Sequence, residues 1–134
     1  MKKSVLVTVV LSLLLTMTVS AQRETKALNL GWRFHFGALD DEAVKTVSTS
    51  GFNDSEWRIL DIPHDFQIEQ PWVKTAKPSR GFKEDSEGWY RKTFTVNPAW
   101  KGKKVLLDVE GIMSFGDAYV NGVKVGSTEY GYLG

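Results

Sequence analysis

The sequence predicts an all-β fold, and two observations carry that prediction. Beyond residue 21, short runs of alternating apolar residues are separated by Gly, Asn, Pro and Asp, which is typical of half-buried strands and turns. No stretch of a dozen residues there has a convincing helical period of 3.6. The strongest local signal is Asn121-Gly122 between two alternating apolar segments, because a tight type I′ hairpin turn needs positive φ at both central residues.

Three strands are predicted in the first part of the domain. The first is 32–36, where aromatic residues alternate with polar ones. The second is 57–62 and stops at Pro63. The third is 89–96 and ends at Pro98, because proline has no N–H to donate to a ladder.

Two more predicted elements follow. Apolar and polar residues alternate over 105–109, which predicts a strand with one buried face, and the Asn-Gly turn joins 118–120 to 123–125 in a hairpin. Aromatic residues that alternate within strands, such as Trp32, Phe34 and Phe94, are expected in the core. Burying each one contributes on the order of 2–3 kcal/mol.

The first 21 residues have the features of a secretory signal peptide. Lys2 and Lys3 precede the uncharged apolar run 5–19, and Val19-Ser20-Ala21 offers a small-residue cleavage site. We therefore expect an exported protein, periplasmic or extracellular, with one domain over 22–134 and no membrane span after cleavage. A retained membrane anchor is the alternative, although the apolar run is short for a bilayer.

Composition excludes several classes of function. The 17 basic and 16 acidic residues leave a net charge of +1, which gives no electrostatic footprint for nucleic acid or anionic membrane. The chain has no cysteine, so disulfides and thiolate-bound metals are excluded. His35 and His64 are the two imidazoles, and no metal-ligand spacing such as HExxH occurs. No metal and no cofactor are predicted.

Candidate binding residues lie in the longer of the predicted connections, because long loops on a rigid β scaffold usually carry binding groups. The connection 64–88 contains Trp72, which follows a proline among polar neighbours, and Arg80. An indole ring can stack on the apolar face of a pyranose or bury itself in an interface, and packing into the core is the alternative.

His64 and Asp65 follow the predicted strand end at Pro63 and could reach sugar hydroxyl groups or a neighbouring domain. Consecutive residues in an extended segment point in opposite directions, so they are not expected to work as one acid/base pair. The alternative is that Asp65 caps the following turn through its side chain while His64 hydrogen-bonds to the backbone.

Several segments occur in a recognisable order: Leu28–Phe34, Trp57–Phe66, Gly88–Phe94, Trp100–Val105, Glu110-Gly111, Tyr119–Gly122 and Gly126–Tyr132. In this order they resemble the amino-terminal sugar-binding domain of family 2 glycoside hydrolases, with most similarity to secreted β-galactosidases of Bacteroidetes-type bacteria. The resemblance covers nearly the whole chain beyond the signal peptide. It implies a jelly-roll β-sandwich.

In full-length members of that family the sandwich packs against an immunoglobulin-like domain and a catalytic (β/α)8 barrel, which needs about 250 residues. The resemblance implies retaining exo-glycosidases that act on carbohydrates and carry two catalytic glutamates in the barrel. No residue of this chain matches either glutamate, so no catalytic residue is predicted. The acidic clusters 40–42 and 84–87 are expected to be solvated surface. We expect the sandwich to be truncated, without the barrel and its own last strand or strands.

Two alternatives stay open: a freestanding carbohydrate-binding module with a complete set of strands, and a structural domain that binds a partner chain through an open sheet edge. The resemblance does not separate β-galactosidase from β-glucuronidase or β-mannosidase relatives, because the barrel sets specificity.

Overall fold

The computed structural model describes residues 23–131. The predicted signal peptide and the end of the segment Gly126–Tyr132 lie outside these residues. In chain order the elements are β1 (Trp32–Phe36), α2 (Asp41–Val47), β2 (Arg58–Leu60), the 3-10 turn η1 (Pro78–Arg80), β3 (Gly88–Arg91), the 3-10 turn η2 (Pro98–Trp100), β4 (Gly116–Val120) and β5 (Val123–Thr128). No helix in the described part is long and apolar enough to cross a membrane.

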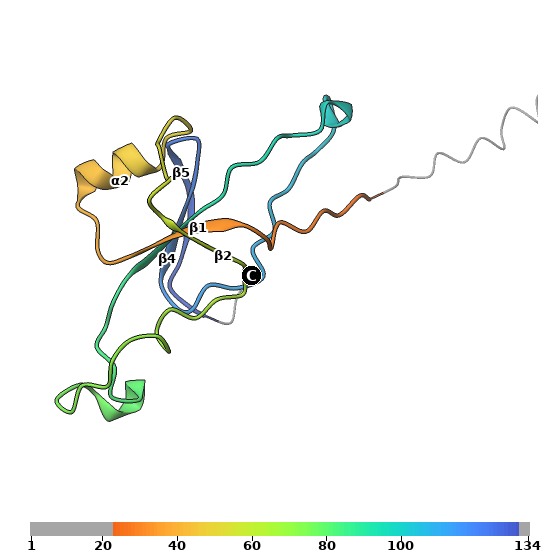
Figure 1. Ribbon diagram of the computed structural model, residues 1–134. Helices are drawn as coiled ribbons and strands as arrows, with labels where there is room; N and C mark the ends of the chain where they lie inside the picture. Colours follow the sequence, from red (N-terminus) through yellow and green to blue (C-terminus); the bar gives the residue numbers. More distant parts are fainter. Residues whose placement is uncertain (1–22, 132–134) are drawn as a thin grey trace, which may run out of the picture.

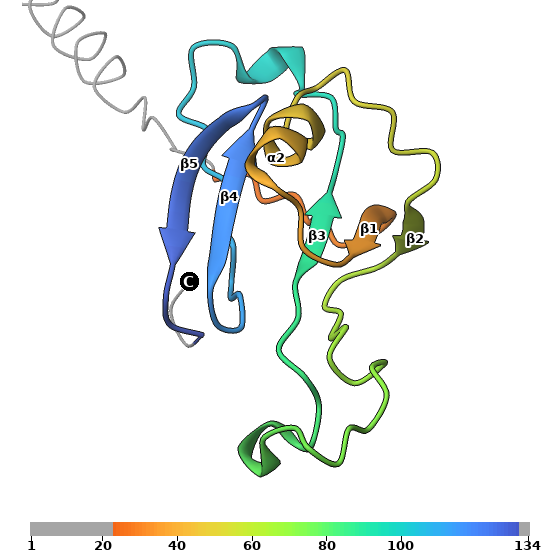
Figure 2. The same cartoon turned by 90° about the vertical axis from the view of Figure 1, so that its left-hand side faces the viewer.

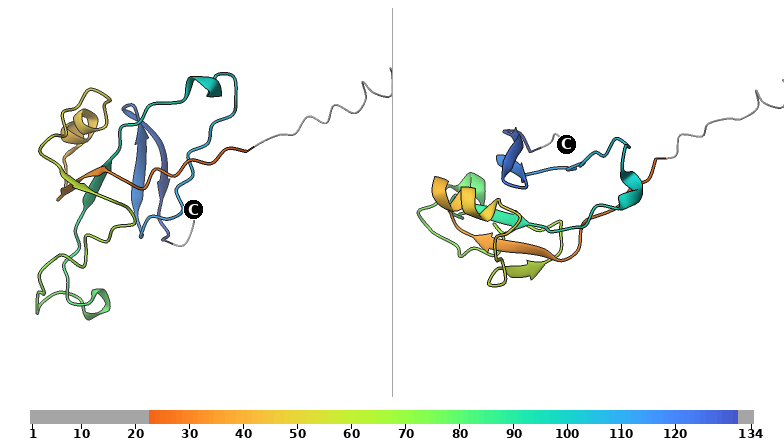
Figure 3. Two further views of the ribbon diagram at one scale, coloured as in Figure 1. Left: turned by 45° about the vertical axis from the view of Figure 1, so that its right-hand side comes forward. Right: turned by 90° about the horizontal axis from the view of Figure 1, so that it is seen from above.

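The strands form two antiparallel sheets, which confirms the all-β prediction. One sheet has the order β2-β1-β3 and the other is the hairpin β4-β5. Seen from above in Figure 3, the hairpin forms a second layer over the three-stranded sheet. The hairpin turn lies beside the end of α2, since a Cβ built on Gly122 would lie 3.9 Å from the Thr49 side chain.

The core is small and centred on β1. Phe34 is 4% exposed, and its ring contacts Phe66 and Tyr90 at centroid distances of 6.0 and 4.9 Å. Trp32 is half-buried. The prediction that Phe94 is a core residue is wrong, because β3 ends at Arg91 and leaves Phe94 47% exposed.

The helix α2 was not expected from the sequence. It is seven residues long, which is too short to produce a visible helical period. Its start is specified locally, because the Asp40 carboxylate accepts a hydrogen bond from the Ala43 N–H at 2.8 Å and two acidic residues occupy the first turn. The acidic cluster 40–42 therefore begins a helix rather than being only a solvated loop.

The strand predicted over 105–109 is extended but belongs to neither sheet. It forms one limb of an arm that leaves β3, turns at η2 and returns to β4 (Figures 1 and 2). The prediction of a buried face is also wrong, since Val105, Leu107 and Val109 are 55%, 58% and 40% exposed. Alternation reports which side chains prefer burial, but a strand also needs a neighbouring backbone with which to pair.

The predicted hairpin turn is confirmed, while the predicted pairing differs at Ala118, which lies opposite Gly126 rather than Val125. Asn121 and Gly122 have φ values of 49° and 85°, and Val120 pairs with Val123 across the turn. The ladder extends to Gly116 paired with Thr128. Positive φ is strained for most side chains but not for glycine, so the turn residues set the register next to the turn. An irregularity between Ala118 and Tyr119 shifts the register farther along the two strands.

Candidate functional site

The candidate site is built on a row of side chains across the three-stranded sheet. Phe34 in β1 pairs with Arg58 in β2 and with Tyr90 in β3, which places the three side chains on one face. The chain after Pro63 folds back over this row and places the His64 ring 5.0 Å from the Phe34 ring, edge-on.

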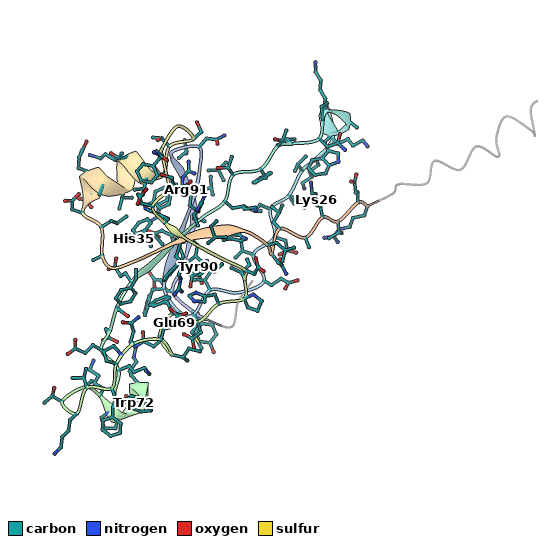
Figure 4. All side chains as sticks on the ribbon, viewed as in Figure 1. Lys26, His35, Glu69, Trp72, Tyr90 and Arg91 are labelled. Atoms are coloured by element: carbon teal, nitrogen blue, oxygen red, sulfur yellow. The ribbon has the colours of Figure 1, made fainter. Side chains whose placement is uncertain are left out.

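Four polar side chains meet there: Arg58, His64, Glu69 and Tyr90, called here the His64 cluster. His64 Nδ1 lies 2.8 Å from the Tyr90 hydroxyl, and His64 Nε2 lies 3.0 Å from Glu69 Oε1. The Arg58 guanidinium donates to both Glu69 oxygens at 3.0 and 2.8 Å and lies 5.0 Å over the Phe34 ring. Glu69 and Tyr90, both labelled in Figure 4, contact different nitrogens of the His64 ring.

The electrostatics of the cluster favour a charged Glu69 and a neutral Tyr90. Hydrogen bonds from His64 and Arg58 hold the pKa of the Glu69 carboxyl below its usual value. Burial raises the pKa of the Tyr90 hydroxyl to about 12, and the negative charges of Asp65 and Glu69 add to the effect.

The His64 ring bonds to side chains at both nitrogens. Nδ1 lies beside the Tyr90 hydroxyl, and Nε2 lies 3.0 Å from both Glu69 Oε1 and the Arg58 guanidinium. The Tyr90 hydroxyl also donates to the His64 carbonyl at 3.4 Å. The cluster therefore fixes the turn after β2 to the sheet.

This arrangement corrects one expectation and confirms another. The prediction that His64 hydrogen-bonds to the backbone is wrong, because its ring bonds to side chains from two distant segments. Asp65 does cap the next turn, accepting the Gln67 N–H at 2.9 Å. Sequence reasoning did not single out Arg58, Glu69 or Tyr90, since only the sheet register brings them to His64.

The other two predicted site residues, Trp72 and Arg80, lie farther along the connection between β2 and β3, and Figure 4 shows Trp72 on the part of it that projects from the sheet. Trp72 is 74% exposed, with the Lys83 ammonium 4.9 Å from its ring centroid. Arg80 ends η1 and forms an ion pair with Asp85 at 3.2 Å. Trp72 is therefore not a core residue.

The loop around Trp72 is held in shape by internal hydrogen bonds. The Val73 N–H donates to the Phe82 carbonyl at 2.8 Å, and the Lys83 ammonium donates to the carbonyls of Ile68 and Gln70. A hollow of about 220 Å³ lies beside it, lined by Thr75, Ala76, Lys77, Lys83, Glu84 and Asp85. It is smaller than the roughly 300 Å³ at which ligand pockets usually start.

A second polar network joins α2 to the sheet. The Arg91 guanidinium donates to Asp54 at 2.6 Å and to the carbonyls of Val47 and Thr49 at 3.2 and 2.7 Å. Arg33 lies 3.6 Å from the same Asp54 carboxylate. In residues 23–131 no group of three His, Asp or Glu side chains is arranged to hold a metal ion.

Comparisons with known proteins give the class of protein. No family profile matches the chain. It is 37% identical to the β-galactosidase BoGH2A of Bacteroides ovatus over 114 residues, which cover 83% of this chain and 13% of that protein. It is 28% identical to a β-glucuronidase of Bacteroides fragilis over 120 residues, or 90% of this chain and 15% of that one.

The crystal structure of a β-glycosidase from Bacteroides vulgatus is also similar, with a TM-score of 0.73 and 39% identity over 82% of this chain and 14% of that chain. The class is therefore an all-β domain of β-glycosidases. Within it, the chain belongs to glycoside hydrolase family 2 and spans only a small part of the length of the relatives it matches.

Proposed function

We propose that this chain is a non-catalytic sugar-binding domain that assists the catalytic domain of an exported exo-β-glycosidase of the β-galactosidase type. The observation that carries the proposal is the 37% identity to BoGH2A over 83% of this chain, at only 13% of that protein's length. The β-galactosidase type is proposed because relatives named β-galactosidase reach 37% and 34% identity, against 30% and 28% for relatives named β-glucuronidase.

The His64 cluster supports a positioning role rather than proton transfer. A general acid in glycoside hydrolysis needs a carboxyl group whose pKa is raised, so that it stays protonated. The pKa of Glu69 is instead lowered by His64 and Arg58. The cluster holds the base of the projecting loop against β1 and β3, and the loop presents its outer side chains.

The contacts to sugar or to a neighbouring domain are proposed for the outer loop, through Trp72 and Arg80, and for the turn at His64 and Asp65. The indole of Trp72 is accessible, and the hydrogen bonds that cross the loop reduce the entropy lost when a ligand binds. The exposed Trp72 also favours a second candidate, a freestanding carbohydrate-binding module.

Two measurements test these proposals. The purified chain is expected not to hydrolyse nitrophenyl β-galactosides. Hydrolysis that disappears in Glu69→Gln, or after another single Asp or Glu substitution, would contradict a non-catalytic role. Tryptophan fluorescence during a β-galactoside titration tests the sugar contact, because saturable binding that is lost in Trp72→Ala would support it, and the absence of binding by the unaltered chain would contradict it.

Arg80 has a matched control in the same loop. Lys77 is exposed and also lies near Asp85, at 3.8 Å. If Arg80 contacts the sugar or a neighbouring domain, Arg80→Met weakens that contact more than Lys77→Met does. Equal effects of the two substitutions would remove Arg80 from the proposal.

Export is proposed from residues 1–21. When the gene is expressed in a Gram-negative host, the mature protein is expected to begin at Gln22, which mass spectrometry of the purified chain would show. Recovery of the full 134-residue chain from the cytoplasm would contradict the proposal.

A further inference from the structure

The turn of the β4-β5 hairpin has a chemical reactivity that the proposed function does not use. Asn121 precedes Gly122, and both residues are exposed at the end of the hairpin that lies beside α2 (Figure 2). The Asn121 side-chain amide has no hydrogen-bond partner among residues 23–131. The Gly122 N–H donates to no carbonyl in this part of the chain. A side-chain amide carbon and the next backbone nitrogen are therefore both available to react.

We propose that Asn121 is a site of spontaneous covalent modification, at which its amide is converted to aspartate and isoaspartate. The Gly122 nitrogen gives its proton to a solvent base and attacks Cγ of Asn121. The bond from Cγ to the side-chain nitrogen breaks, and ammonia leaves with a proton from solvent. Water then opens the resulting cyclic imide. Addition of water at Cγ gives aspartate, and addition at the main-chain carbonyl carbon gives isoaspartate.

Glycine is the residue that hinders this attack least, because it has no Cβ beside the attacking nitrogen. The φ values are +49° at Asn121 and +85° at Gly122. In the left-handed conformation of Asn121 the Gly122 nitrogen is not aligned with Cγ, so the bond between Cα and C of Asn121 must rotate before the ring closes. The rate of modification therefore depends on how often the turn opens.

The turn makes few contacts beyond the hairpin itself. Val120 and Val123, which pair across it, are 43% and 63% exposed. Among the described residues, a Cβ built on Gly122 would come within 4 Å of Thr49 alone. A two-stranded hairpin is marginally stable by itself, and local opening of exposed segments costs far less than global unfolding. We therefore expect the turn to open often enough for the ring to close in the folded chain.

The modification changes the turn in two ways. Both products replace a neutral amide with a carboxylate, so ion-exchange chromatography separates them from the original chain. Isoaspartate also routes the main chain through Cγ and inserts a methylene group into the backbone. A two-residue type I′ turn does not accommodate the additional atom, so the pairing of Val120 with Val123 is expected to be lost. The site therefore limits how long the hairpin keeps its original turn.

The chain supplies its own controls. Three other asparagines are exposed, and each precedes a residue other than glycine: Asn29-Leu30, Asn53-Asp54 and Asn97-Pro98. Pro98 has no N–H and cannot close the ring. The side chains of Asn53 and Asn97 are also engaged, because each Oδ1 accepts a backbone N–H from two residues farther on, at 3.1 and 3.0 Å. Conversion is therefore expected at the hairpin turn before the other three positions.

Peptide mapping by mass spectrometry tests the proposal on the purified chain, incubated at mildly alkaline pH with and without guanidinium chloride. The Asn121 peptide is expected to contain isoaspartate as well as aspartate, because direct hydrolysis of the amide gives aspartate alone. In guanidinium chloride the turn is open. Conversion in buffer is expected to be slower by no more than about tenfold, equivalent to an opening free energy of about 1.4 kcal/mol.

Gly122→Ala places a methyl group beside the attacking nitrogen. Measured in guanidinium chloride, where its effect on the fold does not enter, it is expected to slow conversion about tenfold, while Gly126→Ala leaves the rate unchanged. Conversion no faster at Asn121 than at Asn29, the absence of isoaspartate, or an unchanged rate in Gly122→Ala overturns the proposal. A chain that stays unmodified in buffer while the denatured chain is converted also overturns it, since the native turn then protects the amide.

Discussion

Replacing Arg91 with Met tests whether one side chain fastens α2 and the following loop to the sheet. Arg91 in β3 is 14% exposed and forms an ion pair with Asp54, which is 21% exposed. It also donates to the carbonyls of Val47, Thr49 and Ser50. Methionine keeps most of the aliphatic stem and removes every one of these donors.

The expected loss of stability follows from the groups that lose their hydrogen-bond donor when Arg91 is replaced. Asp54 keeps only the longer contact with Arg33 at 3.6 Å, so a half-buried carboxylate loses its main partner. The exposed carbonyls near Thr49 regain water, while that of the buried Val47 does so less readily. Hydrogen bonds to charged groups contribute about 1.5–3 kcal/mol each but are not additive, so the expected loss of stability is about 2–3 kcal/mol.

Thermal unfolding followed by circular dichroism measures this loss. The expected fall in Tm is about 10–20 °C. Arg80→Met is the matched control, because Arg80 and its partner Asp85 are both more than half exposed, and its loss should stay within about 0.5 kcal/mol. If Arg91→Met costs less than about 1 kcal/mol, or no more than the control, the network does not anchor the helix.

Two further predictions concern the hairpin and the His64 cluster. Gly122→Val should lower the free energy of unfolding in urea by about 1 kcal/mol or more, because φ at Gly122 is +85°. Gly126→Val is the control, because Gly126 lies in open space on β5 and its replacement should leave the stability unchanged. Equal losses of stability in the two variants would refute the argument from backbone conformation. Tyr90 titrates near pH 12 when folded and near 10 when unfolded, so the native state retains a proton that the unfolded state releases. Stability should therefore fall as the pH rises between about 10 and 12, and urea midpoints of Tyr90→Phe should lack this additional fall.

The sequence was most informative where structure depends on neighbouring residues. The β1 strand was predicted at its observed bounds, and the Asn121-Gly122 turn was predicted because positive φ is a property of the residues themselves. The cap at Asp65 is equally local, since donor and acceptor are two residues apart. The short helix α2 was missed although Asp40 is a good N-cap residue, because seven residues give too little period to recognise.

Only half of the candidate site could be predicted from neighbouring residues in the sequence. His64 and Asp65 were singled out because they follow a strand end, but the partners of His64 were not. Tyr90 is 26 residues away and reaches His64 only because β1 pairs with both β2 and β3 in a particular register. Arg91 reaches residues more than 40 positions away for the same reason.

By itself, then, the sequence determined the all-β class, the hairpin turn and the likeness to family 2 glycoside hydrolases, because these depend on local φ preferences, alternation and motif order. Only the tertiary structure decided that Phe34 is buried while Phe94 is not, and that 105–109 belongs to neither sheet formed by residues 23–131. The alternation of apolar and polar residues in 105–109 predicts a strand with one face that favours burial. Whether another strand lies against it depends on where the rest of the chain runs, and that is set by contacts between residues far apart in sequence.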